Sequence, residues 1–159
     1  MVYILGRDGR DEDVVSAFNR YRQYLASVKT SFPPSAYDLA TSDWYFDPSN
    51  HRCPHDAWLE KFELFEVSDG TPNKNRTLSL KVRLRAAYHD GYIELHYLRV
   101  IKYRLFLDDG TSGHRDWRYD ELRLSDSGHL VHEIEWQGAA STGVWIIEAS
   151  DVRFCWEDG

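Results

Sequence analysis

Regular alternation of apolar and polar residues, from Trp58 almost to the end of the chain, restricts the fold more than any other sequence feature. It is clearest in four stretches: residues 78–85, 93–97, 101–107 and 130–136. Side chains along a β-strand point alternately to its two faces, so these stretches predict half-buried strands with one face toward solvent. We therefore predict a β-sheet over residues 58–157.

Turn signals separate the alternating stretches. Each is a pair of residues that tolerates the positive φ of a tight hairpin turn: Asp69-Gly70, Asp90-Gly91, Asp109-Gly110 and Ser127-Gly128. Short turns make neighbouring strands antiparallel. The expected sheet is mainly antiparallel and meander-like, with about seven strands. A half-barrel or a sandwich are the alternatives for how it curls.

The residues before the sheet follow a helical period. Apolar residues recur at intervals of four and three, which places them on one face of a helix: Val14, Phe18, Tyr21, Leu25 and Val28. Acidic residues 11–13 suit the positive end of the helix dipole, and Pro33 and Pro34 prevent its continuation. We predict an amphipathic helix over residues 11–30 that packs on the sheet, and an ordered connection over residues 31–57.

Together these elements predict an α+β fold. A chain of 159 residues suits one domain, residues 1–159. No stretch approaches the roughly 20 apolar residues of a membrane-spanning helix. The amino end lacks the basic flank of a signal peptide, and Cys53 and Cys155 are too few for a disulfide framework. We expect a cytoplasmic protein that does not associate with membranes.

Charge restricts the choice of partner. The net charge of −7 disfavours nucleic acid, whose phosphates would be repelled, and favours a protein with a basic surface. The charge is also uneven. Residues 76–105 carry seven basic and two acidic residues, a net of +5, whereas residues 106–159 carry four and twelve, a net of −8.

Two interpretations of this asymmetry are open. In the first, basic and acidic side chains face each other on neighbouring strands and form a cross-strand ladder, each pair contributing about 0.2–1 kcal/mol. In the second, the acidic part is a protein-binding surface, since surface charge governs specificity and association rate. The residues expected to form that surface are Asp116, Asp120, Glu121, Glu133 and Glu135.

The segment His51-Arg-Cys-Pro-His55 is the densest group of metal-ligand residue types. Structural zinc sites need four ligands, which usually come as two pairs. No second pair of Cys or His residues is present, so His51, Cys53 and His55 are only weak metal candidates. A polar link that leads into the strand at Trp58 is the more economical interpretation, and we expect no cofactor.

His132 interrupts an otherwise apolar strand face between Leu130 and Ile134. The expected role is a core residue that is hydrogen-bonded to backbone or to a carboxylate, and the alternative is a ligand or a pH-sensing group. Glu133 and Glu135 share the other face of this strand. Such alternation is more typical of a solvated sheet surface than of a glycosidase carboxylate pair. The sequence contains no complete motif of a known enzyme class.

The small acidic β-rich chain with one amino-terminal helix resembles, in architecture and charge alone, bacterial immunity proteins that neutralise toxins. The resemblance implies a non-catalytic cytosolic protein-binding module, and it assigns no residues. The alternative is a small-molecule or metal-binding protein that uses the His51–His55 loop and the histidines of the sheet, with catalysis as one of its forms.

Overall fold

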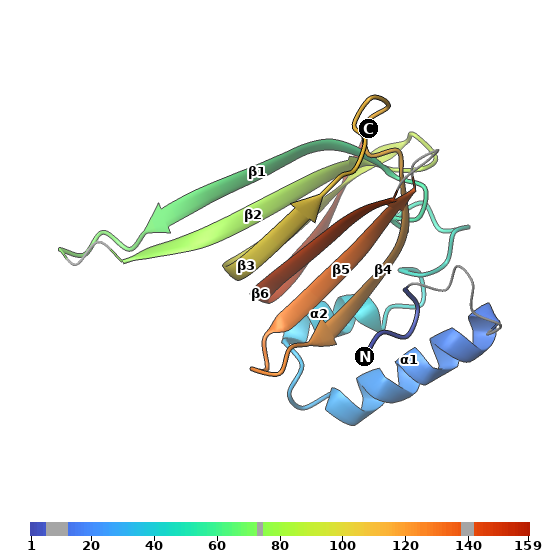
Figure 1. Cartoon of the computed structure of the whole chain (residues 1–159), viewed down its shortest axis with the longest axis horizontal. Helices are drawn as coiled ribbons and strands as arrows, with labels where there is room; N and C mark the ends of the chain where they lie inside the picture. The colour runs from blue at the N-terminus through green and yellow to red at the C-terminus, as the bar shows by residue number, and fades with distance from the viewer. Residues whose placement is uncertain (6–12, 73–74, 138–141) are drawn as a thin grey trace.

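A computed structural model describes residues 1–5, 13–72, 75–137 and 142–159 and shows an α+β fold (Figure 1). Two helices precede six strands: α1 (Val14–Val28), α2 (Pro34–Ala40), β1 (Trp58–Ser68), β2 (Arg76–Arg85), β3 (Gly91–Phe106), β4 (Asp116–Leu124), β5 (Leu130–Gln137) and β6 (Thr142–Asp158). Every strand pairing is antiparallel. The predicted fold class is confirmed.

The sheet closes into a barrel with the strand order β1-β2-β3-β6-β5-β4. Hairpins join β1 to β3 and β4 to β6, and the long pairing of β3 with β6 connects these two halves. Only one residue pair, Trp58 with Asp116, joins β1 to β4. The sheet therefore curls further than a half-barrel, one of the two alternatives, and its closing seam is very short.

The structure has six strands in its described part, because two of the alternating stretches belong to one strand. Residues 93–97 and 101–107 both lie largely in β3. A register shift between Val100 and Lys102 separates them, and Arg99 has a φ of 47°. A bulge of this kind bends a strand and changes which residues face inward.

Two of the predicted turns contain a glycine with positive φ, at Gly70 and Gly128. The turn at Asp90-Gly91 differs, since the positive φ belongs to His89. Gly91 is required for another reason. A Cβ atom added there would lie 2.2 Å from the Trp156 indole, so only glycine lets this ring pack against the backbone.

Helix α1 (Val14–Val28) lies within the predicted residues 11–30 and is shorter at both ends, and residues 11 and 12 lie outside the described part. Asp13 caps it, because its Oδ1 accepts the backbone N–H of Ser16 at 2.9 Å. Of the predicted stripe, Tyr21 and Leu25 are buried, whereas Val14 is exposed.

The ordered connection contains a helix that the sequence pattern did not reveal. Pro34 begins α2, where its missing N–H is tolerated. The carboxylate of Asp151 on β6 accepts the N–H groups of Ser35 and Ala36, at 3.2 and 2.8 Å. The first turn of α2 is therefore attached directly to the sheet.

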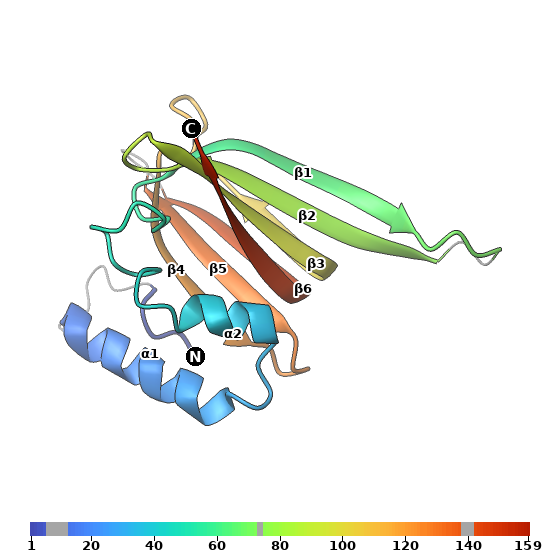
Figure 2. The same cartoon turned by 180° about the vertical axis from the view of Figure 1, so that it is seen from behind.

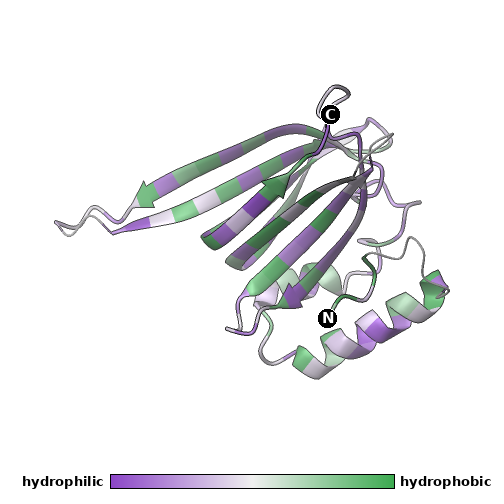
Figure 3. Cartoon of the chain, viewed as in Figure 1, coloured by the Kyte–Doolittle hydropathy of each residue, from purple (hydrophilic) through white to green (hydrophobic). Residues whose placement is uncertain are grey.

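Both helices lie on one side of the barrel, away from the projecting ends of β1 and β2 (Figures 1 and 2). Alternation of polar and apolar residues is visible along the strands (Figure 3). Inward-facing side chains of the strands pack with side chains of the helices in one core, whose largest fully buried members include Trp117, Trp136, Trp145, Tyr21, Tyr45 and Tyr97. Among the described residues, no helix is long and apolar enough to cross a membrane.

Candidate functional site

The ends of β1 and β2 project from the barrel as a two-stranded arm (Figures 1 and 2). It is formed by residues 65–68 and 76–79. The pairing of β2 with β3 begins at Leu80, which lies opposite Tyr97. Beyond that point, β1 and β2 pair with each other alone among the described strands. A two-stranded ribbon is only marginally stable by itself, so an arm of this kind gains from contact with another surface.

The outer edge of β1 has no strand partner in the described structure after its first residue. Trp58 pairs with Asp116, and residues 59–68 pair on one side only, with β2. We call residues 59–68 on this side the β1 edge. Their outward backbone N–H and C=O groups form a template that another strand can join.

Large apolar side chains are exposed along β1. The exposed fractions are 50% for Trp58, 44% for Phe62, 37% for Leu64, 37% for Phe65 and 47% for Val67. Because positions alternate, Phe62 and Leu64 share one face of the strand, and Phe65 and Val67 share the other. An apolar surface of this extent, next to an open edge, is typical of an interaction site.

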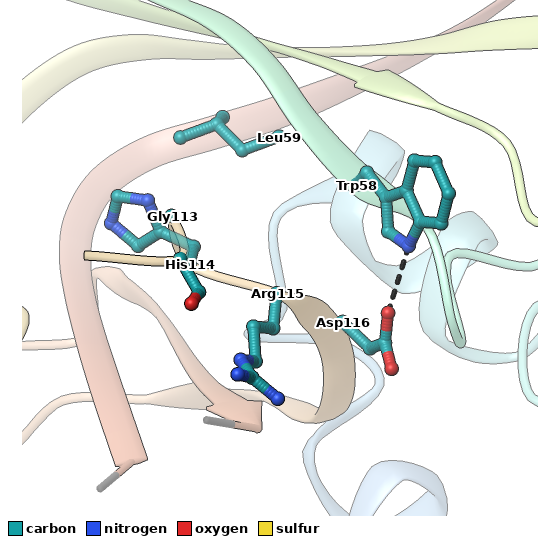
Figure 4. A pocket seen from close by; sticks show the side chains of 7 residues that line it. Trp58, Leu59, Gly113, His114, Arg115 and Asp116 are labelled. Atoms are coloured by element: carbon teal, nitrogen blue, oxygen red, sulfur yellow. Dashed lines mark hydrogen bonds between the residues drawn. The ribbon is translucent and has the colours of Figure 1, made fainter. Parts of the chain in front are cut away.

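A pocket of about 550 Å³ lies at the start of the β1 edge (Figure 4). It is formed between the first residues of β1 and the segment that leads into β4, and is lined by Trp58, Leu59, Ser112, Gly113, His114, Arg115 and Asp116. The indole Nε1–H of Trp58 donates to Asp116 Oδ1 at 2.8 Å and fixes the wall of the pocket. The volume is in the range of ordinary ligand sites.

The electrostatics of this pocket are balanced. Burial lowers the pKa of His114, so its imidazole is neutral near pH 7. Its ring packs against Trp136 and Trp145, with 5.1 Å between the centroids in each case. Arg115 and Asp116 then supply one positive and one negative charge. Arg115 has a φ of 60°, a left-handed conformation that costs a non-glycine residue energy and often marks a functional position.

A second group of polar side chains is buried in the barrel around Asp120. Its carboxylate accepts three hydrogen bonds, from Tyr45 Oη (2.8 Å), Trp117 Nε1 (2.9 Å) and His132 Nε2 (2.8 Å). His132 Nδ1, on the other side of the ring, lies 2.7 Å from the hydroxyl of Tyr97. Both predicted features of His132, a core position and a carboxylate partner, are confirmed.

Asp120 and Glu121 do not belong to an acidic surface, because they are only 4% and 0% exposed. A register shift between Trp117 and Tyr119 turns Asp120 toward the barrel interior. Glu121 Oε2 accepts the N–H groups of Tyr3 and Ile4, at 2.8 and 2.6 Å. The amino-terminal segment therefore covers Glu121, whose pKa is raised by burial. Asp120 and Leu122 are two residues apart and so share one face of the strand. The apolar Leu122 was the feature of the sequence that could have indicated that Asp120 faces inward.

The remaining acidic candidates lie apart from one another. Asp116 lines the pocket beside β1, whereas Glu133 on β5 forms an ion pair with Arg123 on β4. Glu135 lies two residues further along β5, opposite Tyr119 and Val144. No contiguous patch that contains all five predicted residues is present, since two of them are buried.

Ion pairs between neighbouring strands occur along the sheet, as the ladder interpretation predicts. They include Arg76 with Glu66 (2.8 Å), Arg83 with Glu60 (3.0 Å) and Lys102 with Glu148 (3.0 Å). The basic strands β2 and β3 therefore face acidic positions on β1 and β6. Most of these pairs are exposed, so each contributes little to stability.

The segment His51–His55 is a link whose side chains have separate partners. His51 bonds to Asp90 and stacks on Tyr88, at a centroid distance of 4.1 Å. Cys53 is buried with its Sγ on the carbonyl of Tyr45, and burial raises its thiol pKa to about 12. His55 Nδ1 donates to the carbonyl of Arg118 at 2.7 Å. Within the described residues, no three His, Cys, Asp or Glu side chains could together hold a metal ion.

Ser127, His129 and Glu148 form a cluster on the outside of the barrel that sequence patterns did not indicate. Ser127 Oγ and Glu148 Oε1 lie 3.1 and 3.2 Å from the same histidine atom, Nδ1. A catalytic triad needs the imidazole to contact the nucleophile through one nitrogen and the acid through the other. The cluster therefore lacks the geometry of a serine-hydrolase site.

No known protein family, curated protein or solved structure matches this chain. Its functional interpretation therefore depends on its own geometry. The two features that sequence patterns missed, the open β1 edge and the pocket at its start, are the most distinctive surfaces of the described structure.

Proposed function

We propose that this protein is a non-catalytic protein-binding module that receives a partner along the β1 edge and the arm. One observation carries the proposal: residues 59–68 of β1 lack a second strand partner in the described structure, and the same strand exposes five large apolar side chains. Partner segments commonly bind such edges by adding a strand, with main-chain hydrogen bonds providing affinity and side-chain contacts providing specificity.

The most specific form of this proposal is the neutralisation of a toxin in the bacterial cytosol. It is supported by the small α+β fold and by the net charge of −7, which favours a partner with a basic surface. We propose the apolar arm as the binding surface. The acidic surface expected from the sequence is not proposed, because Asp120 and Glu121 are buried.

The test is co-expression with the product of the neighbouring gene, followed by size-exclusion chromatography and a growth assay. We expect a stable complex and restored growth with the wild-type protein. The double variant Phe65→Lys, Val67→Lys places charges on the arm and should weaken binding at least about ten-fold. The matched control Val14→Lys, Val15→Lys changes exposed residues of α1 and should bind normally. Equal binding by both variants would contradict the proposed surface.

Small-molecule binding is a second candidate, supported by a pocket of about 270 Å³ whose lining includes Cys53, His55, Tyr45 and Asp120. This pocket brings part of the His51–His55 link next to the buried carboxylate. A thermal-shift screen with small polar metabolites tests it. A ligand that stabilises the wild-type protein, but not the His55→Ala variant, would support this candidate.

A further inference from the structure

We propose that the pocket at the start of β1 binds the C-terminal carboxylate of an extended partner segment, which adds to the β1 edge as an antiparallel strand. This inference rests on the proposed function, because it uses the same edge. It goes further by specifying which end of the partner binds, in which direction the segment runs and which residues recognise it.

The position of the pocket determines the direction of the added strand. Trp58 and Leu59 line the pocket and are the first two residues of β1, and the edge continues from there to Ser68. A strand that runs antiparallel to β1 ends at its start, so its C-terminus would enter the pocket. A parallel strand would place its amino terminus there, and an ammonium group would be repelled by Arg115.

Arg115 is available for a carboxylate. Figure 4 shows its guanidinium without a hydrogen bond to the other labelled side chains, whereas Asp116 is bonded to Trp58. The pKa of Asp109 is lowered mainly because its carboxylate accepts the N–H of Thr111 at 2.9 Å, and the positive charge of Arg115 adds to this effect. A guanidinium can bind a carboxylate through two parallel hydrogen bonds, the geometry that a free C-terminus offers.

The neutral balance of the pocket also favours a peptide terminus. The negative charge of Asp116 beside Arg115 disfavours a ligand with two negative charges, such as a phosphate monoester. A C-terminal residue has a single negative charge and an adjacent amide N–H. This N–H can donate a hydrogen bond to the carboxylate of Asp116. Trp58 and Leu59 supply an apolar wall for the last side chain.

A free amino acid offers a carboxylate and a nitrogen similar to those of a peptide C-terminus. The β1 edge is the feature that favours a peptide as the occupant of the pocket. Only a peptide can also use the backbone groups of residues 59–68 and the apolar side chains Phe62 and Leu64. Continuity between the pocket and the open edge therefore favours a C-terminal segment of several residues as the occupant.

The experiment uses the full chain and two libraries of nine-residue peptides, one with free C-terminal carboxylates and one with C-terminal amides. Affinity selection should enrich the free acids, and their amide counterparts should bind about ten-fold or more weakly, since hydrogen bonds to charged groups are among the stronger ones. Arg115→Ala should cause a similar loss. The control Arg104→Ala removes another exposed arginine, on β3, and should change nothing. Circular dichroism melts verify that both variants fold.

Each contrary outcome has a distinct meaning. Equal binding of acids and amides, with loss in the Phe65→Lys, Val67→Lys variant, would overturn the carboxylate pocket and leave the proposed function intact. Saturable binding of free leucine that displaces the peptides and survives in that arm variant would make the pocket an amino-acid site, and would overturn edge docking. If neither library binds, the inference is wrong, and the co-expression test still decides the proposed function separately.

Discussion

Strands β1 and β4 flank the same seam, yet the edge of β4 is covered by other side chains and the edge of β1 is open. On β4, the Tyr21 hydroxyl lies 2.7 Å from the carbonyl of Leu122 and 3.0 Å from its N–H, and the N–H of Leu124 bonds to Tyr24 Oη at 2.8 Å. On β1, no side chain of the described residues is placed in this way. An edge strand that a protein covers contributes to its fold, whereas one left open is available to a partner.

Sequence alternation alone does not distinguish the two strands. Both contain aromatic and acidic residues, and both begin with a residue of the single closing pair. Their difference comes from the elements that pack on them: α1 and the amino-terminal segment cover β4, and β1 projects past the barrel. Burial is therefore decided by tertiary position instead of by local pattern.

The largest expected effect separates two aspartates of β4. Asp120→Ala would leave the buried donors of Tyr45, Trp117 and His132 without their acceptor, and should lower the free energy of unfolding by about 3–5 kcal/mol. Asp116→Ala removes a carboxylate at the β1 seam and should cost within about 0.5 kcal/mol, as is usual for surface changes. Urea denaturation of both variants provides the measurement. Similar losses in the two would contradict the contrast between the covered interior of β4 and its seam with β1.

A matched pair of leucines sharpens the comparison. Leu122 on β4 is fully buried, and Leu64 on β1 is 37% exposed. Leu122→Ala should destabilise the protein by about 2–5 kcal/mol because it leaves a cavity. Leu64→Ala should cost less than half as much, since part of that side chain already contacts solvent. A loss at Leu64 as large as that at Leu122 would show that β1 is covered at the base of the arm.

The smallest expected effect concerns pH. Burial raises the pKa of Glu121 in the folded protein. The resulting contribution to stability is present below the unfolded pKa, near 4.5, and is lost as pH rises through the folded value. Unfolding measured from pH 4 to pH 7 should therefore show that Glu121→Gln is less destabilised, relative to wild type, at the higher pH. A pH-independent difference would mean that residues 3 and 4 do not cover Glu121 as described.

Local features of the fold were predictable. Residue period revealed α1 and the strands, and glycine pairs marked the turns, because both depend on neighbouring residues. The bulges near Arg99 and Tyr119 were not, since a register shift depends on the partner strand. Helix α2 was missed because its attachment involves Asp151, more than a hundred residues away.

The candidate site was less accessible from sequence. The role of His132 was predicted because a polar residue on an apolar face needs a partner. The β1 edge gave no signal, since its residues alternate as in any strand. It is open only because β4 pairs with β1 at a single residue pair. Asp116 was selected for its charge, and the structure gives it a different significance, as a wall of the pocket.

The pairing of β3 with β6 has a consequence for how the chain folds. Paired residues of the two strands lie between 38 (Phe106 and Val144) and 67 (Gly91 and Asp158) positions apart. Their contacts therefore form at a high entropic cost of loop closure, a property that slows folding. During synthesis, β1, β2 and β3 emerge well before β6 is made. Until then the edge of β3 that later pairs with β6 stays unpaired, while β1, on the other side of β2, exposes its apolar side chains. Newly made chains are therefore most prone to mispairing in the interval before the sixth strand appears.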